Sequence, residues 1–315
     1  GEPELAVPKL VKEICSGQDY KKIDGLCFID DKEWVVSKSY AVADMEKLPV
    51  LPYDKLNLKQ YSWPKDPCNW KFGRRAVYES SRGCPYNCIF CFREGFRGKF
   101  RKKPFAKVKE ELGRMKQAGV EYFYFIDETF GVDDEWTRQV CSEIKERGMK
   151  WVCETRPECL DREKIAYMTD SGCIEVQIGL ESANKNVLKI LNKGTMNLEE
   201  LRKNVLFMVD RGIHVKFFCI LGAPGETKKT IRETFNYVFQ FPLDKVNAAA
   251  NIMVPYPDTR LWLMGRKEGK TLKDWDDVER YAGIIGNNFN SQSIVLDEVA
   301  RFNARILREQ ARLRI

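Results

Sequence analysis

The chain has 315 residues, of which 43% are hydrophobic and 31% are charged, values that are ordinary for a globular protein with a substantial core. No window approaches the ~18 consecutive apolar residues of a membrane-spanning helix, so we expect no transmembrane segment and no membrane anchor. The net charge of +7 is mild at this length and only weakly favours anionic ligands.

The cysteines and the histidine narrow the chemistry further. Eleven cysteines could form a disulfide framework, but the number is odd, and Cys153, Cys173 and Cys219 lie inside apolar strand-like runs. This usage favours a reducing compartment, the cytoplasm, with buried thiols and a metal site. Because His214 is the single histidine, histidine-based triads and zinc sites of the C2H2 type are excluded or nearly so.

Residues 1–60 predict a small α+β appendage. Apolar positions spaced as on one face of a helix run through residues 4–16. Residues 25–36 predict two short strands around a turn at residues 30–32. A proline-punctuated connector follows at residues 48–58, and we place a boundary there.

Residues 61–265 repeat one pattern, in which a short apolar strand, a loop and an amphipathic helix that ends on glycine follow one another. The helices are expected to end at Gly119, Gly148, Gly172 and Gly212. The strands are expected at residues 76–80, 122–126, 150–154, 174–179, 215–221 and 246–254. Six such units imply an α/β fold with a parallel sheet, either an open partial barrel or a doubly wound sheet.

Residues 266–315 predict a mostly helical C-terminal extension. Its main helix candidate, residues 291–315, has apolar positions at Val295, Val299, Phe302, Ile306 and Ala311. Since an amphipathic face usually meets the core, we expect this helix to pack on the preceding domain.

Polar residues stand where the predicted strands end. They are Asp127 and Glu128, Glu154 and Arg156, Gln177 and Glu181, residues 222–226, and residues 255–258. In either fold the carboxyl ends of parallel strands meet at one mouth, where active sites lie. We therefore expect these residues to gather at one site.

The most specific feature is the spacing C-x3-C-x2-C of Cys84, Cys88 and Cys91, in the loop after the first strand. Three thiolates can hold three irons of a cubane cluster and leave the fourth iron open for an amino and carboxylate ligand. A zinc knuckle or three unrelated thiols are the alternatives. Zinc would want a fourth cysteine or histidine, but His214 lies far along the chain and Cys68 has no paired neighbour.

With Phe90 directly before its last cysteine, this loop resembles that of the radical S-adenosylmethionine (radical SAM) superfamily. The resemblance covers residues 76–262 and implies a partial (β/α)6 TIM-like barrel. It also implies a 4Fe-4S cluster on Cys84, Cys88 and Cys91, SAM as a second cofactor, and an electron donor such as flavodoxin or ferredoxin. In that family one electron from the cluster cleaves SAM to methionine and a 5′-deoxyadenosyl radical, which abstracts hydrogen from the substrate.

The resemblance also implies contacts to SAM. The backbone of Phe90 would lie near adenine, and Asp127 and Glu128 stand where the family usually has Gly-Gly-Glu. Arg156 would offer a cation to the SAM carboxylate. The remaining expected contacts, from the ends of the fourth, fifth and sixth strands, are Gln177, Glu181, Ser182, Leu221, Gly222, Pro255 and Tyr256.

A narrower resemblance is to the cobalamin-associated branch of that superfamily. It rests on Gly-Glu-Pro-Glu at residues 1–4, the connector at 48–58, Gly-Leu-Glu-Ser at 179–182 and Pro-Tyr-Pro at 255–257. In that branch Gly-Glu-x-Glu comes late in a cobalamin domain, so residues 1–60 resemble its remnant. Cobalamin is therefore expected only if the N-terminal domain is supplied, and the chain is either a piece of a longer protein or a natural short form.

Five basic residues fall within residues 97–103, just after the cysteines. A solvated loop is the favoured interpretation, and recognition of an anionic substrate group or of a reductase is the alternative. Nucleic acid is not expected as a partner, because no RNA-binding motif accompanies these residues.

The expected function is radical chemistry that ends in carbon methylation or another carbon-centred transformation of a small-molecule or peptide substrate. A methylthiotransferase is less expected, because no second cysteine triad precedes the first. Cobalamin-independent formation of a C–C bond is a further alternative. Outside enzymes, the alternative is a non-catalytic iron-sulfur or zinc protein that acts as a scaffold or electron carrier.

Overall fold

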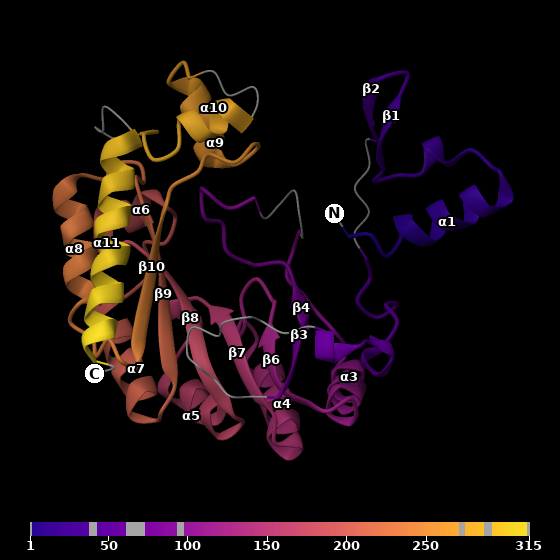
Figure 1. Ribbon diagram of the computed structural model, residues 1–315, viewed down its shortest axis with the longest axis horizontal. Coiled ribbons are helices and arrows are strands. Elements are labelled where there is room, and N and C mark those ends of the chain that lie inside the picture. The colour runs from indigo at the N-terminus through magenta and orange to yellow at the C-terminus, as the bar shows by residue number, and fades with distance from the viewer. Residues whose placement is uncertain are drawn as a thin grey trace.

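The computed structural model describes residues 2–37, 43–60, 73–92, 98–270, 275–286 and 292–313. A six-stranded sheet lies at its centre, with helices along the outside and the N-terminal part to one side (Figure 1). The strands are β3 Arg74–Tyr78, β6 Val120–Phe125, β7 Lys150–Thr155, β8 Cys173–Glu181, β9 His214–Leu221 and β10 Val246–Ile252. All six predicted strands are present, with ends that differ by a few residues.

The order of strands decides between the two predicted folds. Across the sheet it is β10-β9-β8-β7-β6-β3, and every neighbouring pair is parallel. Each strand therefore lies beside the one that precedes it in the sheet, whereas a doubly wound sheet reverses its order at a switch point. The doubly wound alternative is wrong and the partial barrel is confirmed, with β3 and β10 at its open edges.

Helices cover the outer face of this sheet (Figure 1). They are α3 Phe105–Gln117, α4 Asp134–Arg147, α5 Arg162–Asp170, α6 Lys185–Ile190, α7 Leu198–Asp210 and α8 Lys228–Val238. Helices α9 Arg260–Lys267 and α10 Trp275–Arg280 follow in the chain and lie beyond the ends of the strands (Figure 1). The four glycines predicted to end helices all have positive φ, which an L side chain rarely adopts. No helix in the described ranges is long and apolar enough to cross a membrane.

The main core lies between the outer face of the sheet and these helices. On β9 the side chains of Val215, Phe217, Cys219 and Leu221 are buried in this core. The alternate positions, such as Lys216 and Phe218, are only half-buried on the other face. Polar and aromatic side chains on the inner face of the barrel are therefore not packed in the main core.

The C-terminal helix α11, Gln292–Leu313, packs on β10 and β9 as predicted. Val295, Phe302 and Ile306 are buried, and the Phe302 ring lies 4.6 Å from that of Phe235 in α8. Ala311 is exposed, so its assignment to the packed face is wrong. It lies five residues after Ile306, which turns it about 140° around the helix from that residue.

The N-terminal part contains the predicted helix and hairpin. Helix α1 spans Ala6–Ser16, and strands β1 Cys27–Asp30 and β2 Glu33–Val36 pair antiparallel around a two-residue turn. Apolar side chains stay open to solvent on both elements: Ile14 of α1 is 58% exposed and Trp34 of β2 is 70% exposed. In the described residues, nothing covers this apolar surface.

The packing of α11 leads to a stability prediction. Changing Phe302 to Ala removes a fully buried ring from between α11 and α8, so we expect the free energy of unfolding to fall by about 3–5 kcal/mol. Leu307→Ala, on the same helix but 67% exposed, should change it by less than about 0.5 kcal/mol. Urea unfolding followed by circular dichroism measures both, and equal effects would show that α11 does not pack as described.

Candidate active site

The three cysteines lie on a loop that leaves the sheet after β3. We call residues 83–92 the cysteine loop. Its base is a two-stranded ribbon in which β4, Ser81–Arg82, pairs antiparallel with β5, Arg101–Lys102. Its far side is fixed by two backbone hydrogen bonds, from Ile89 N to Leu191 O at 3.3 Å and from Leu261 N to Ile89 O at 3.0 Å.

Cys84, Cys88 and Cys91 are present as thiols, and all three reach at least partly to solvent. Cys84 Sγ lies 3.3 Å from Thr129 Oγ1, and Cys88 Sγ accepts a hydrogen bond of 2.9 Å from Arg156 Nη1. Because a cubane cluster takes one thiolate at each iron, three thiols on one irregular loop fit three of its four irons. By number and type these thiols could hold three irons of a 4Fe-4S cluster, although the described residues contain no three metal-ligating side chains gathered closely enough to hold a metal ion.

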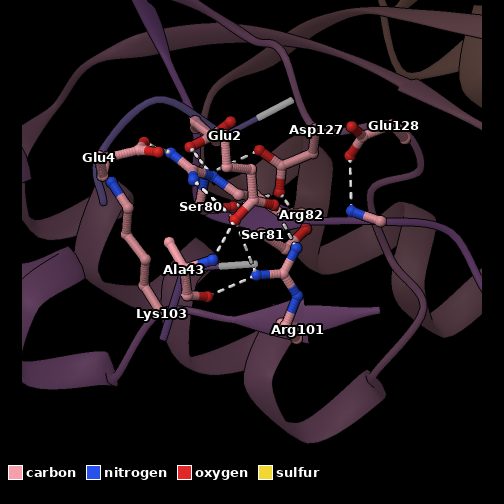
Figure 2. Close-up of polar contacts among 12 residues, drawn as sticks. Glu2, Glu4, Ala43, Ser80, Ser81, Arg82, Arg101, Lys103, Asp127 and Glu128 are labelled. Atoms are coloured by element: carbon pink, nitrogen blue, oxygen red, sulfur yellow. Dashed lines mark hydrogen bonds and ion pairs between the residues drawn. The ribbon is translucent and has the colours of Figure 1, made fainter. Parts of the chain in front are cut away.

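Asp127 and Glu128, directly after β6, hold the base of the cysteine loop (Figure 2). The buried Asp127 carboxylate accepts hydrogen bonds from Ser80 N at 2.8 Å, Ser80 Oγ at 2.6 Å and Ser81 Oγ at 2.5 Å. Burial raises the pKa of Asp127 to about 6, against the opposing effect of these bonds. Glu128 accepts from Gly83 N at 2.9 Å. Both carboxylates thus position the loop, and their contact with SAM stays a prediction.

Arg156, after β7, links the cysteine loop to the partly buried Glu158. Its guanidinium donates through Nη2 and Nε to the two carboxylate oxygens of Glu158, at 2.9 and 3.2 Å, and lies over the Tyr86 ring at 4.0 Å. Its third contact is the thiol of Cys88. A planar fork can satisfy all of these at once, which a lysine could not.

A second cation, Lys193, is buried near the same thiol. Its Nζ donates to Gly179 O at 2.6 Å and to Glu181 Oε1 at 2.8 Å, where β8 is irregular and Glu181 has a positive φ. Burial raises the pKa of the Cys88 thiol, and the charges of Lys193 and Arg156 oppose that rise. Two cations, each with its own carboxylate, therefore flank one cysteine of the loop.

The predicted residue Gln177 lies on the inner face of the barrel. Its side chain donates to Glu175 and lies 3.4 Å from the Tyr124 hydroxyl, which also donates to Glu154. These groups come from three neighbouring strands, β6, β7 and β8. They form a polar wall below the cysteine loop.

Three further predicted residues have roles in the fold. The Ser182 hydroxyl is buried beside Thr234, and the Leu221 side chain lies in the outer core. Gly222 has φ of +85°, and a Cβ there would meet the backbone of Gly283 at 2.5 Å. Any ligand contact from Leu221 would therefore come from its backbone, and residue 222 must be glycine.

The last predicted contacts meet at an apolar cluster beside the cysteine loop. Phe90 and Ile220 pack with Ile89, Leu191 and Met253, which lie on the loop, after α6 and after β10. Pro255 is buried, whereas Tyr256 is 46% exposed. This cluster brings the loop close to the ends of β9 and β10.

The basic stretch after the loop is solvated only in part: Lys99 and Lys102 are exposed, whereas Arg101 is partly buried and Lys103 is buried, which differs from the prediction. Arg101 pairs with Glu2, Lys102 with Asp133 and the buried Lys103 with Glu111. Glu2 and Asp133 lie 99 and 31 residues from their partners, whereas Glu111 lies on α3, eight residues after Lys103. Arg97 lies outside the described residues.

The sequence did not indicate Lys193, Glu158 or Thr129 as members of the site. Lys193 follows α6 in a short polar segment that has no periodic pattern, and Glu158 looks like any loop acid. Their roles depend on contacts with Glu181 and Arg156 that only the fold creates. The one local signal was the proximity of Glu158 to Arg156, two residues away.

Comparison with known proteins indicates the family of the chain. A family model described as the radical SAM superfamily matches residues 78–238. The chain is similar to an uncharacterized methyltransferase of Pyrococcus horikoshii, with 28% identity over 270 residues, or 83% of this chain and 56% of that protein. It is also similar to an anaerobic magnesium-protoporphyrin IX monomethyl ester cyclase of Cereibacter sphaeroides, with 26% identity over 83% of this chain and 43% of that protein.

A solved structure has the same fold. The radical S-adenosylmethionine methyltransferase TsrM from Kitasatospora setae, with cobalamin and a [4Fe-4S] cluster bound, matches with a TM-score of 0.65 and 16% identity. The match covers 85% of this chain and 53% of TsrM. The chain thus spans about half the length of the proteins it matches.

The loop after β9 leads to a prediction about pH. Glu226 Oε2 accepts hydrogen bonds from Gly222 N at 2.5 Å and Ala223 N at 3.2 Å. The other carboxylate oxygen, Oε1, is buried and has no hydrogen-bond partner among the described residues. Burial raises the pKa of this carboxyl group from 4.5 to about 7. A raised folded-state pKa gives stability that is present at low pH and lost as pH rises through 7.

Between pH 5 and pH 8, the stability of the native chain relative to a Glu226→Gln variant should therefore fall by about 2 kcal/mol. Urea unfolding of both proteins at the two pH values measures this difference. A difference that is constant or that grows with pH would contradict the assignment.

Proposed function

The chain belongs to the radical SAM superfamily, and on that premise we propose that Cys84, Cys88 and Cys91 hold a 4Fe-4S cluster that works with SAM. The observation that carries the proposal is the cysteine loop, which places three thiols at the carboxyl end of a parallel partial barrel. One of these thiols, Cys88, accepts a hydrogen bond from Arg156. When bound, the cluster would supply the electron that cleaves SAM to methionine and a 5′-deoxyadenosyl radical, which abstracts hydrogen from a substrate carbon.

Arg156 is proposed to bind the carboxylate of SAM. It lies against Cys88, so a ligand at the open iron would come within reach of its guanidinium. Glu158 holds that guanidinium in place through two hydrogen bonds. Arg156 would thus orient the carboxylate of SAM, while the negative charge of Glu158 balances the charge of the guanidinium.

The other proposed contacts to SAM are those at the ends of the strands: the backbone of Phe90 and the residues Asp127, Glu128, Gln177, Glu181, Ser182, Leu221, Gly222, Pro255 and Tyr256. Support comes from the shared apolar cluster of Phe90 with Ile220, which offers a flat ligand a packing surface. We propose that the Glu181 carboxylate, which pairs with Lys193, accepts hydrogen bonds from the ribose hydroxyls.

For the reaction after hydrogen abstraction, we propose carbon methylation, in line with the methyltransferase named among the relatives. Another carbon-centred transformation is the second candidate, since a cyclase is also among them. The proposed partners are a small-molecule or peptide substrate and an electron donor such as flavodoxin or ferredoxin. Cobalamin would act only with an N-terminal domain supplied.

The proposed division of the chain follows the same reasoning. Residues 61–265 would form the radical SAM barrel and residues 1–60 the end of a cobalamin-binding domain. Residues 266–315 would be an extension that completes the barrel's outer layer, because α11 packs on β10.

A cysteine variant tests the proposed function. After anaerobic reconstitution with iron and sulfide and reduction, we expect the native chain to form 5′-deoxyadenosine from SAM and Cys88→Ala to form none above background. Cys27→Ala, which removes an exposed thiol on β1, is the matched control and should behave as the native chain. If the loaded native chain gives no more product than Cys88→Ala, a non-catalytic iron-sulfur or zinc protein becomes the better description.

Arg156 gives a separate prediction about affinity. Arg156→Lys keeps the charge but not the fork, so the Kd for SAM on the reconstituted protein should rise about tenfold, equal to about 1.4 kcal/mol. Arg138→Lys, an exposed arginine on α4 paired with Glu163, is the control and should leave the Kd unchanged. Equilibrium dialysis with SAM measures both. An equal Kd in the two variants would remove Arg156 from the SAM site.

A further inference from the structure

The ribbon at the base of the cysteine loop places two arginines opposite each other. Arg82 of β4 and Arg101 of β5 are direct partners in the antiparallel register. Arg82 is two residues before the first cysteine, and its side chain is only 8% exposed. Two buried or half-buried guanidinium groups so close together repel each other unless an anion lies between them.

The anion is Glu2, which comes from the segment before α1 (Figure 2). Its side chain is fully buried, and its carboxylate accepts hydrogen bonds from Arg101: Oε1 from Nη2, and Oε2 from Nη1 at 3.2 Å. Oε2 also lies 3.4 Å from Arg82 Nη1, which is an ion pair without a hydrogen bond. Oε2 also accepts from Ala43 N at 2.6 Å. One carboxylate thus bridges both strands of the ribbon.

Each arginine also has further partners near Glu2. Arg82 pairs with Glu4 through Nη2 and with Glu79 through Nε at 2.7 Å. Arg101 Nη1 donates to Ala43 O at 2.6 Å. Burial alone would raise the pKa of Glu2, but the bonds from Arg101 and Ala43 N and the nearby positive charges lower it overall, so the carboxylate is charged at neutral pH.

The ribbon has little freedom to absorb a loss of this anion. Gly83 has φ of +78°, and a Cβ there would lie 2.3 Å from Lys99 O, so the two strands run in close contact where the loop begins. Separation of Arg82 from Arg101 would therefore move Gly83 and, next to it, Cys84. The backbone pairing of β4 with β5 joins the two residues, and Glu2 links their side chains.

We propose that Glu2 is a positioning residue for the cluster: by bridging Arg82 and Arg101 it fixes the separation of the two strands that carry the cysteine loop. This inference rests on the proposed function, since it concerns retention of the proposed cluster. Glu2 touches neither the thiols nor a cofactor. It acts through the arginines and the backbone between Arg82 and Cys84.

The test compares Glu2→Gln with the native chain after anaerobic reconstitution of both. Glutamine keeps the size of the side chain but removes the charge, so one of the two arginines loses its anion. The rate at which a chelator removes iron should rise about tenfold, as for other residues that orient metal ligands. The electron paramagnetic resonance spectrum of the reduced cluster should also broaden or change shape.

Glu33→Gln, an exposed glutamate on β2, is the matched control and should match the native chain in both measurements. Glu2→Asp keeps the charge on a shorter side chain and should recover part of the iron retention. Circular dichroism and urea unfolding report on the barrel itself. If Glu2→Gln does not fold, Arg101→Lys replaces it, since an ammonium cannot reproduce the fork of two nitrogens that contacts both oxygens of Glu2, and it should give the same faster loss.

Three outcomes are distinguishable. A native chain that takes up no cluster contradicts the proposed function. A native chain that holds a cluster, with iron loss and spectrum unchanged in Glu2→Gln and Arg101→Lys, overturns the role of Glu2 alone. Faster iron loss that only follows a proportional loss of global stability would reduce Glu2 to a structural residue and would also overturn the inference.

Discussion

The buried carboxylate of Asp127 is the interaction on which the site depends. It lies at the end of β6 and binds the two serines that follow β3, so it joins neighbouring strands where the sheet's hydrogen bonds stop. This costs desolvation, which the raised pKa of Asp127 records. The hydrogen bonds of Asp127 fix the path of the backbone after β3, and this path places Cys84 at the mouth of the barrel.

Charge balance is the second organising constraint. Around the cysteine loop, Arg156 pairs with Glu158 and Lys193 pairs with Glu181, whereas Glu2 is shared by Arg101 and Arg82. Buried charges survive in a protein only in such pairs. The pairs leave the loop near neutrality overall while two positive groups remain close to Cys88, where anionic ligands or a reduced metal centre would feel them most.

Local pattern was enough for much of the fold and little of the site. The six strands, the glycines that end the helices and the cysteine spacing are visible in short windows of sequence. Strand order is not, because the two candidate folds share the same local units. The partners of Arg101 and Lys103 were also invisible, since Glu2 lies 99 residues from Arg101 and no periodicity links them. The burial of Arg101 and Lys103 within the basic stretch was therefore not predicted.

The N-terminal part contains one well-packed residue, Glu2, and one poorly packed element, the β1–β2 hairpin. Glu2 is buried among arginines, whereas the β1–β2 hairpin leaves Trp34 and Val36 in solvent and pairs with no third strand in the described residues. A lone two-stranded hairpin is marginally stable in water. Local unfolding should therefore begin at this hairpin, and its backbone amides should exchange hydrogen first. The hairpin can then unfold as a separate cooperative unit while Glu2 keeps its contacts with the arginines of the ribbon.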